Sequence, residues 1–118
     1  MIEIVADKDI PYLKEVFENS KSFRLKALPF NEINKKTLKN SQALLSRSAT
    51  ILNDELISDT DVKFIFSLTS GEDHIDYDFL SSREIFIKTA KGANAQAVLE
   101  YTLDALSFSS EKKVGLIG

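Results

Sequence analysis

Residues 63–76 read Lys63-Phe64-Ile65-Phe66-Ser67-Leu68-Thr69-Ser70-Gly71-Glu72-Asp73-His74-Ile75-Asp76, and this stretch decides the fold of the chain. Its apolar first half is typical of a strand buried on both faces of a parallel sheet, although periodicity alone also allows a buried helix. Thr69-Ser70-Gly71 then predicts a sharp turn with hydroxyls and free backbone N–H groups. Because open α/β sheets bind ligands beyond the carboxyl ends of their strands, this turn is a candidate site for an anion or a hydroxy acid. The alternative is an ordinary turn that only connects two elements.

The composition indicates one globular domain. The 118 residues are 43% hydrophobic and 28% charged, close to globular averages. A net charge of −3 offers no general attraction to nucleic acid or to a membrane surface. With no cysteine and one histidine, we expect neither disulfides nor a metal site. Met1–Asp7 carries acid where a signal peptide carries base, so we predict a cytoplasmic protein.

Strand and helix signals alternate along the chain, which indicates βαβ units and a parallel sheet with right-handed crossovers. Phe23, Leu25 and Ala27 alternate with basic residues, as in a strand near a sheet edge. The predicted strands cover residues 2–5, 23–27, 43–46, 64–67 and 85–87; the predicted helices cover 10–20, 53–57, 77–83 and 93–108.

Local signals place the helix ends and one loop. Asp7 and Asp9 are predicted to cap the first helix, with Pro11 in its first turn, and Asn53 is predicted to cap the second. Residues 30–36 are predicted to be a loop. Within it, Lys35-Lys36 fits a solvated charge cluster better than a nucleic-acid patch.

The helix at 93–108 is the longest, about 24 Å at 1.5 Å per residue. Apolar residues cover most of its circumference, so we expect burial on more than one side. This pattern indicates a second partner surface, formed with another subunit or a further domain; the alternative is a central core helix. Val114-Gly115-Leu116-Ile117-Gly118 reads as a short strand that stops where the glycine motif of a dinucleotide-binding domain would begin.

An ordered series of segments resembles the N-terminal part of the NAD-dependent D-2-hydroxyacid dehydrogenases over essentially the whole chain. The closest resemblance is to members that act on a phosphorylated 2-hydroxy acid in pyridoxal phosphate biosynthesis. The segments are Ile4-Val5-Ala6-Asp7 with Ile10-Pro11-Tyr12, Ala43-Leu44-Leu45-Ser46-Arg47-Ser48-Ala49-Thr50, Val62-Lys63-Phe64 with Asp73-His74-Ile75-Asp76, Gly92-Ala93-Asn94-Ala95-Gln96-Ala97-Val98-Leu99-Glu100-Tyr101, and Val114–Gly118.

The resemblance implies a flavodoxin-like substrate domain: an open parallel five-stranded sheet with helices on both faces, in three layers. This domain would span residues 1–110 and include the linking helix 93–108. Residues 111–118 would be the truncated first strand of a missing Rossmann domain that binds NAD. The family's catalytic arginine, glutamate and histidine would lie beyond the chain, so we expect no catalysis and no cofactor for this chain alone.

The resemblance also assigns candidate site residues. Ser48 and Thr69 would contact the substrate through their hydroxyls, and Gly71 would allow its close approach. Arg47 would help hold an anionic group, with an ordinary surface ion pair as the alternative. Asn94 could reach the cleft, although a helix cap is favoured. His74 is not the family's catalytic histidine and is expected to make structural hydrogen bonds. Gly118 would begin the missing glycine motif.

The sequence departs from the family pattern near this cleft. Phe66 and Glu72 replace a usual glycine and threonine, and Lys91 and Ala93 replace a usual proline and cysteine. We hypothesise that Glu72 and Lys91 compensate each other's charge, because an extra carboxylate would repel a phosphorylated substrate.

Two further expectations concern the whole chain. Val114–Ile117, severed from its sheet, should be disordered, paired with another chain, or added to a sheet edge. The chain would be an expressed fragment or the product of a truncated gene. A different class of function remains open: a stand-alone flavodoxin-like module that binds an anion at the Thr69 turn and forms a homodimer through helix 93–108.

Overall fold

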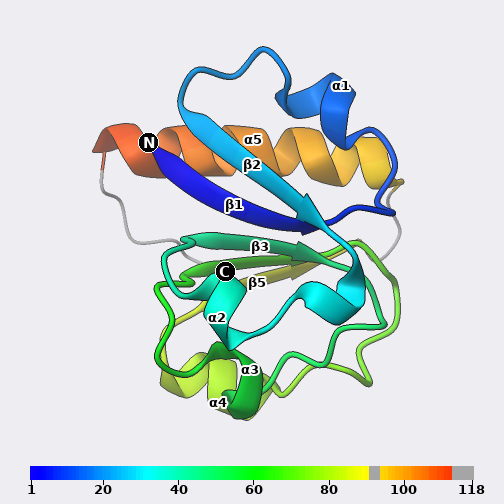
Figure 1. The fold of residues 1–118 in the computed structure, drawn as a ribbon, viewed down its shortest axis with the longest axis vertical. Coiled ribbons are helices and arrows are strands. Elements are labelled where there is room, and N and C mark those ends of the chain that lie inside the picture. Colours follow the sequence, from blue (N-terminus) through cyan, green and yellow to red (C-terminus); the bar gives the residue numbers. More distant parts are fainter. Residues whose placement is uncertain (91–93, 113–118) are drawn as a thin grey trace.

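The structure, a computed structural model, describes residues 1–90 and 94–112, with side chains described up to residue 108. Ten helices and strands alternate in the described chain, together with one turn of 3₁₀ helix at Phe30–Glu32 (Figure 1). The strands are β1 (Ile2–Asp7), β2 (Phe23–Leu28), β3 (Ala43–Ser46), β4 (Phe64–Ser67) and β5 (Phe86–Thr89), and the helices are α1 (Leu13–Phe17), α2 (Lys35–Leu38), α3 (Asp54–Ile57), α4 (Tyr77–Ser82) and α5 (Ala95–Lys112).

The five strands form one parallel sheet in the order β2-β1-β3-β4-β5. This is the flavodoxin-like order, so the predicted fold class is confirmed. The predicted edge position of β2 is confirmed as well. The chain leaves β1 toward β2 and then crosses back to β3, which makes the boundary between β1 and β3 the topological switch point where such sheets bind ligands.

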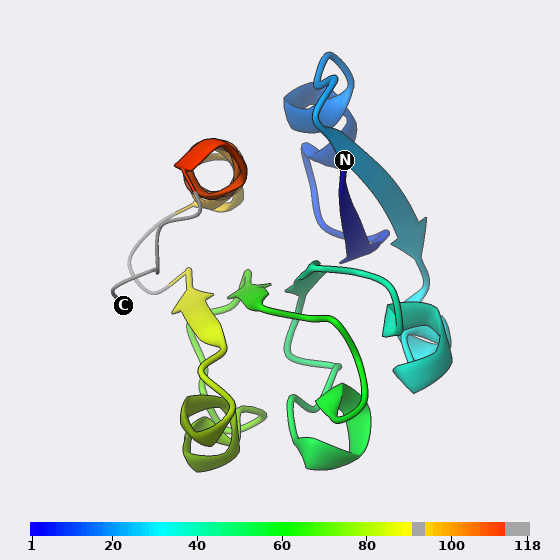
Figure 2. The same ribbon diagram turned by 90° about the vertical axis from the view of Figure 1, so that its left-hand side faces the viewer.

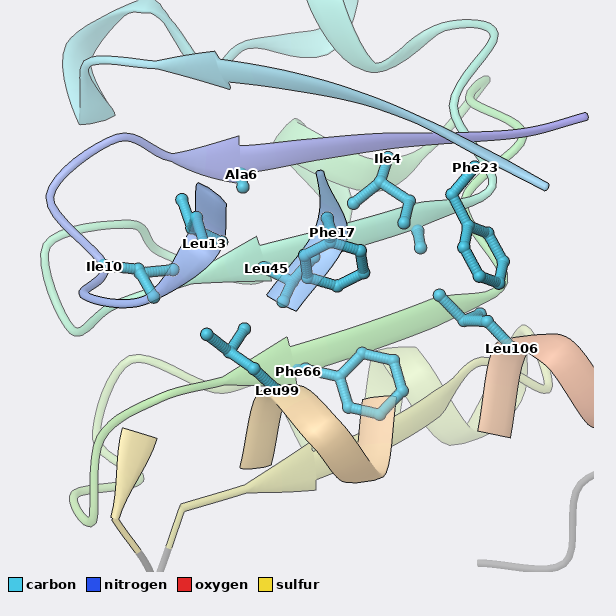
Figure 3. Close-up of a cluster of buried hydrophobic side chains, with 11 residues drawn as sticks. Ile4, Ala6, Ile10, Leu13, Phe17, Phe23, Leu45, Phe66, Leu99 and Leu106 are labelled. Atoms are coloured by element: carbon cyan, nitrogen blue, oxygen red, sulfur yellow. The ribbon is translucent and has the colours of Figure 1, made fainter. Parts of the chain in front are cut away.

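Helices cover both faces of the sheet. Figure 2 looks nearly along the strands and shows α1 and α5 on one face and α2, α3 and α4 on the other. Each face has its own buried apolar cluster, because successive side chains of a strand point to opposite sides. Leu99 and Leu106 project from α5 into the same cluster as Leu45 and Phe66 (Figure 3). Every residue of β3 is buried, which explains its continuous apolar sequence.

Phe66 belongs to the core beneath α5. It is 0% exposed and its ring centroid lies 5.9 Å from Phe86 and 6.4 Å from Tyr101. Burying a side chain of this size stabilises the fold by about 2–3 kcal/mol. Phe66, which stands where the family usually has glycine, therefore fills the core between the sheet and α5.

The start of the first helix differs from the prediction. α1 begins at Leu13, three residues later than expected, and its N-cap is Tyr12, which has a left-handed φ of 68° and no side-chain cap. Asp7 and Asp9 do not cap it, and Pro11 precedes the helix instead of standing in its first turn. The reason is tertiary: Asp7 is the buried last residue of β1 and holds Arg47 and the backbone N–H of Asp9.

Caps built from neighbouring residues follow the sequence. Asn53 accepts a hydrogen bond from the Leu56 N–H at 3.2 Å, and Asn94 accepts one from the Ala97 N–H at 2.8 Å, so both predicted caps are confirmed. The predicted loop at 30–36 is partly wrong, because Asn34 and Thr37 form a reciprocal capping box that starts α2 at Lys35.

Helix α5 is buried on one side within the described chain. Val98, Leu99 and Leu106 are 5% exposed or less, whereas Tyr101 and Phe108 are 44% and 46% exposed. The expected burial on more than one side is therefore not found here, and the alternative of a central core helix is wrong. Because Tyr101 and Phe108 are nearly half exposed, a partner surface on α5 stays a prediction.

Candidate functional site

A row of polar side chains crosses the sheet at its carboxyl edge. Ser46 pairs with Ser67 and Ser67 pairs with Thr89, while the pair Ala6–Leu45 places Asp7 next to Ser46. The row faces α2–α4, since the residues two positions earlier on β1, β3 and β4 belong to the apolar cluster on that side. Asp7, Ser46 and Ser67 are 0% exposed. Sequence reasoning missed this row, although its signal was present: a polar residue ends each of these strands.

Asp7 and Arg47 join the ends of β1 and β3 at the switch point. The Arg47 Nε donates to Asp7 Oδ2 at 3.0 Å, and its Nη2 donates to Asp9 Oδ2 at 3.4 Å. The ion pair weighed as the alternative for Arg47 is thus present, but it is half-buried: the Arg47 side chain is 35% exposed and that of Asp7 is 0%. Because two carboxylates share one guanidinium, the role of Arg47 in holding an anion stays a prediction.

The turn after β3 presents a hydroxyl to solvent. Thr50 N–H donates to the Arg47 carbonyl at 3.2 Å and closes the turn, which leaves Ser48 exposed. Behind it, Ser46 Oγ and Thr50 Oγ1 are buried without a hydrogen-bond partner in the described part of the chain. A buried hydroxyl without a hydrogen-bond partner destabilises the fold. Packing of the core therefore does not account for these two hydroxyls at this edge of the sheet.

The turn after β4 holds Thr69 half-buried. Its Oγ1 lies 3.2 Å from Ser67 Oγ and 3.5 Å from the Gly71 carbonyl oxygen, and its own carbonyl accepts from Ala90 N–H at 3.3 Å. Around Gly71 the space is open, since a Cβ built there meets nothing within 4 Å. β3 and β4 are neighbours, so the fold brings the turns of Ser48 and Thr69 to the same edge of the sheet.

His74 is hydrogen-bonded to Ser67, the last residue of β4, directly before this turn. It is 7% exposed, and its Nε2 lies 2.8 Å from Ser67 Oγ, so the expected structural hydrogen bond is confirmed. Burial lowers the pKa of His74, and the nearby charge of Asp73 opposes this only in part. The imidazole is therefore neutral at pH 7.

Glu72 has a partner on α4. The Tyr77 hydroxyl donates to Glu72 Oε1 at 2.6 Å. Burial and this hydrogen bond to a carboxylate raise the pKa of Tyr77 to about 12. Lys91 and Ala93 lie outside the described residues, as do Gly118 and the strand predicted at Val114–Ile117, so the compensation of Glu72 by Lys91 stays a hypothesis.

The first βα turn of this chain does not fit the pyrophosphate of NAD. A dinucleotide-binding domain places glycines in its first βα turn so that backbone can approach the phosphates. The corresponding turn here, Asp7 to Tyr12, contains two carboxylates and no glycine. Within residues 1–90 and 94–112, no group of three metal-binding side chains gathers and no helix is long and apolar enough to cross a membrane.

Together, the switch point and the hydroxyl-bearing turns define a doubly wound α/β domain of the kind that binds a small ligand at its carboxyl edge. Residues 1–115 match the family described as D-isomer specific 2-hydroxyacid dehydrogenase, catalytic domain, and the chain belongs to that family.

Its curated relatives include proteins named erythronate-4-phosphate dehydrogenase. The chain is 40% identical to the one from Hahella chejuensis, over 99% of this chain and 32% of that protein. It is 35% identical to the one from Saccharophagus degradans, over 99% of this chain and 33% of that protein. The chain thus spans about a third of the length of the curated relatives it matches.

A solved structure shares the fold. The D-lactate dehydrogenase of Aquifex aeolicus, determined with NAD and lactic acid, superposes with a TM-score of 0.62 at 18% identity. The match covers 98% of this chain and 39% of that one. At this identity, the likeness shows the fold of the chain alone.

Proposed function

We propose that this chain is the substrate-binding domain of an NAD-dependent 2-hydroxyacid oxidoreductase that acts on erythronate 4-phosphate. The observation that carries the proposal is the 40% identity to a protein of that name over 99% of the chain. Residues 1–110 are assigned to the substrate domain and residues 111–118 to the start of the Rossmann domain that binds NAD, with the correction that Glu111 and Lys112 still belong to α5 and not to the predicted strand. A cytoplasmic location is part of the proposal.

Ser48 and Thr69 are the groups proposed to touch the substrate. Both follow neighbouring strands, and their hydroxyls can donate to a carboxylate or a phosphate oxygen. The open space around Gly71 suits a ligand close to the backbone. Arg47 contributes only part of the positive charge that such a substrate requires, because Asp7 and Asp9 already share it. We infer that the second domain supplies most of that charge.

The chain alone is proposed to be inactive. Hydride transfer from a 2-hydroxy acid needs a nicotinamide, a base for the hydroxyl proton and a cation for the carboxylate. His74 is buried and hydrogen-bonded to Ser67, so it is unsuited to be that base.

An absorbance assay for NADH, with erythronate 4-phosphate and NAD, tests the proposal. We expect no turnover by the chain and turnover by a chain extended with the coding sequence downstream of Gly118. Activity of the unextended chain would contradict the proposal that the catalytic groups and the NAD site lie in the second domain. An extended chain that remains inactive with this substrate would contradict the substrate assignment.

The second candidate is a stand-alone module that binds an anion and forms a homodimer. Tyr101 and Phe108 on α5 favour it, because both side chains are nearly half exposed, although the Tyr101 ring also contacts Phe66 and Lys88, and exposed apolar surface on one helix is typical of an interface. A native stop codon after Gly118 supports the module, and an in-frame Gly-x-x-Gly motif supports the dehydrogenase.

A further inference from the structure

Three side chains form a continuous hydrogen-bonded line from the core to the Thr69 turn. His74 Nε2 lies 2.8 Å from Ser67 Oγ, and Ser67 Oγ lies 3.2 Å from Thr69 Oγ1. The first two residues are 7% and 0% exposed, whereas Thr69 is half-buried. A buried imidazole is therefore connected, through one buried hydroxyl, to the hydroxyl proposed to contact the substrate.

The line is held at both ends by backbone hydrogen bonds. The His74 carbonyl accepts from Leu52 N–H at 2.8 Å, and the Leu52 carbonyl accepts from Asp76 N–H at 2.9 Å. On the other side, Ala90 N–H donates to the Ser67 carbonyl at 3.0 Å. Leu52 is itself 0% exposed, so the imidazole is fixed to the connection between β3 and α3.

The tautomer of His74 sets the direction of every hydrogen bond in the line, because each hydroxyl has a single proton. A proton on Nε2 is donated to Ser67, which leaves the Ser67 proton for Thr69, the other side chain that Ser67 Oγ meets in the described chain, and the Thr69 proton then remains available. A proton on Nδ1 leaves Nε2 as an acceptor. Ser67 then donates to His74 and Thr69 donates to Ser67, which makes Thr69 only an acceptor for a ligand.

The surroundings favour the proton on Nε2. Ser67 Oγ is an acceptor at 2.8 Å, whereas among the described residues no hydrogen bond is made by Nδ1. Nδ1 is not among the fully buried atoms without a partner, so the direction of the line rests on its other end, where the Thr69 hydroxyl donates to the Gly71 carbonyl and therefore accepts from Ser67. The competing acceptor for the Thr69 proton, the Gly71 carbonyl, is at 3.5 Å, the outer limit of a hydrogen bond, and a substrate oxygen could replace it.

We propose that His74 is a positioning residue for the substrate: its Nε2–H, acting through Ser67, keeps the Thr69 hydroxyl proton free to donate to an anionic oxygen. The inference rests on the proposed function, since it assigns Thr69 the donor role toward an acid. A buried structural histidine of either tautomer would satisfy the core equally well. The positioning role requires Ser67 to donate to Thr69, whereas a purely structural role allows either direction of that hydrogen bond.

The tautomer can be measured without a ligand. His74 is the only histidine among the 118 residues, so its ring ¹⁵N signals in the intact chain need no residue assignment. We expect a protonated Nε2 and an unprotonated Nδ1 at neutral pH. A protonated Nδ1 would overturn the proposal, because Thr69 would then have to donate to Ser67.

Binding of erythronate 4-phosphate, followed by the amide shifts of residues 69–71, tests the consequence. Thr69→Val should weaken binding by about tenfold, the effect of losing one hydrogen bond to a charged group. His74→Met should weaken binding as well, because Ser67 is then free to accept the Thr69 proton. His74→Gln should stay close to the original affinity, because its amide N–H can donate in place of Nε2–H. Ser82→Ala, which removes an exposed hydroxyl that donates to the Phe79 carbonyl, is the matched control.

The outcomes separate this inference from the proposed function. If Thr69→Val weakens binding and a folded His74→Met does not, the inference is wrong and the proposed function stands. If the original chain does not bind this probe at all, the proposed substrate is in question, and the ¹⁵N signals alone decide the direction of the line. Thermal unfolding of each variant establishes that it folds.

Discussion

Loss of the negative charge of Asp7 should destabilise the domain far more than loss of a surface charge. Asp7→Asn keeps an oxygen for the Asp9 N–H but presents a neutral amide to Arg47. Breaking a fully buried pair costs about 3–5 kcal/mol, and an exposed pair contributes about 0–1 kcal/mol. With Asp7 0% and Arg47 35% exposed, we expect about 2 kcal/mol. For a domain of this length, that lowers Tm by roughly 8 °C.

A double-mutant cycle isolates the pair. Free energies of unfolding in urea, followed by far-UV circular dichroism, are compared for the original chain, Asp7→Asn, Arg47→Met and the double variant. The matched control is the pair Arg24–Glu3, which also reaches β1 and is shorter, at 2.7 Å, but has side chains 66% and 35% exposed.

If burial decides the strength, the Asp7–Arg47 coupling should exceed the Arg24–Glu3 coupling, which should stay below about 1 kcal/mol. An Asp7–Arg47 coupling below about 0.5 kcal/mol would refute the reasoning, because solvent would then screen the pair as it screens a surface pair.

Three further predictions concern α4, the buried histidine and α5. Glu84 has a φ of 56° at the glycine position of the Schellman motif that ends α4, so Glu84→Gly should raise the unfolding free energy by about 0.5–1 kcal/mol; no gain in urea unfolding would show that the turn is unstrained. Burial lowers the folded pKa of His74 below 6.5, so the folded state binds its proton less readily than the unfolded state. Stability should therefore fall as the pH drops from about 7.5 to 5.5, and His74→Gln should remove part of this loss when unfolding is compared across that range. If α5 forms a homodimer, Phe108→Glu should lower the sedimentation coefficient to that of a monomer while the exposed control Glu100→Gln leaves it unchanged; a chain that is monomeric before substitution would refute the dimer.

Sequence reasoning reached the fold because the fold depends on local and periodic signals. Short apolar runs followed by polar turns marked the strands, and their alternation with helices restricted the topology to a parallel sheet. The caps Asn53 and Asn94 were predictable, since a cap joins a side chain to a backbone N–H only three residues away. The α2 helix was missed although the signal, Asn34 followed by Thr37, was present.

The site was only partly predictable. Ser48, Thr69 and Gly71 were placed by resemblance, and the structure brings their turns to one edge of the sheet. The polar row from Asp7 to Thr89 was missed because its members become neighbours only through strand register. Single residues such as Ser46 and Ser67 look unremarkable in the sequence.

By itself, the sequence determined the order of the strands and of all helices but α2, the burial of the central strands and the caps of α3 and α5, because each depends on residues close together in the chain. Tertiary structure alone decided that Asp7 holds Arg47, 40 residues away, rather than capping α1. It also decided that the Glu72 carboxylate pairs with Tyr77 and that His74 reaches Ser67 beneath Thr69. The physical reason is competition: a buried charge or hydroxyl binds whichever partner the packed sheet brings within reach, and strand order and register set that partner.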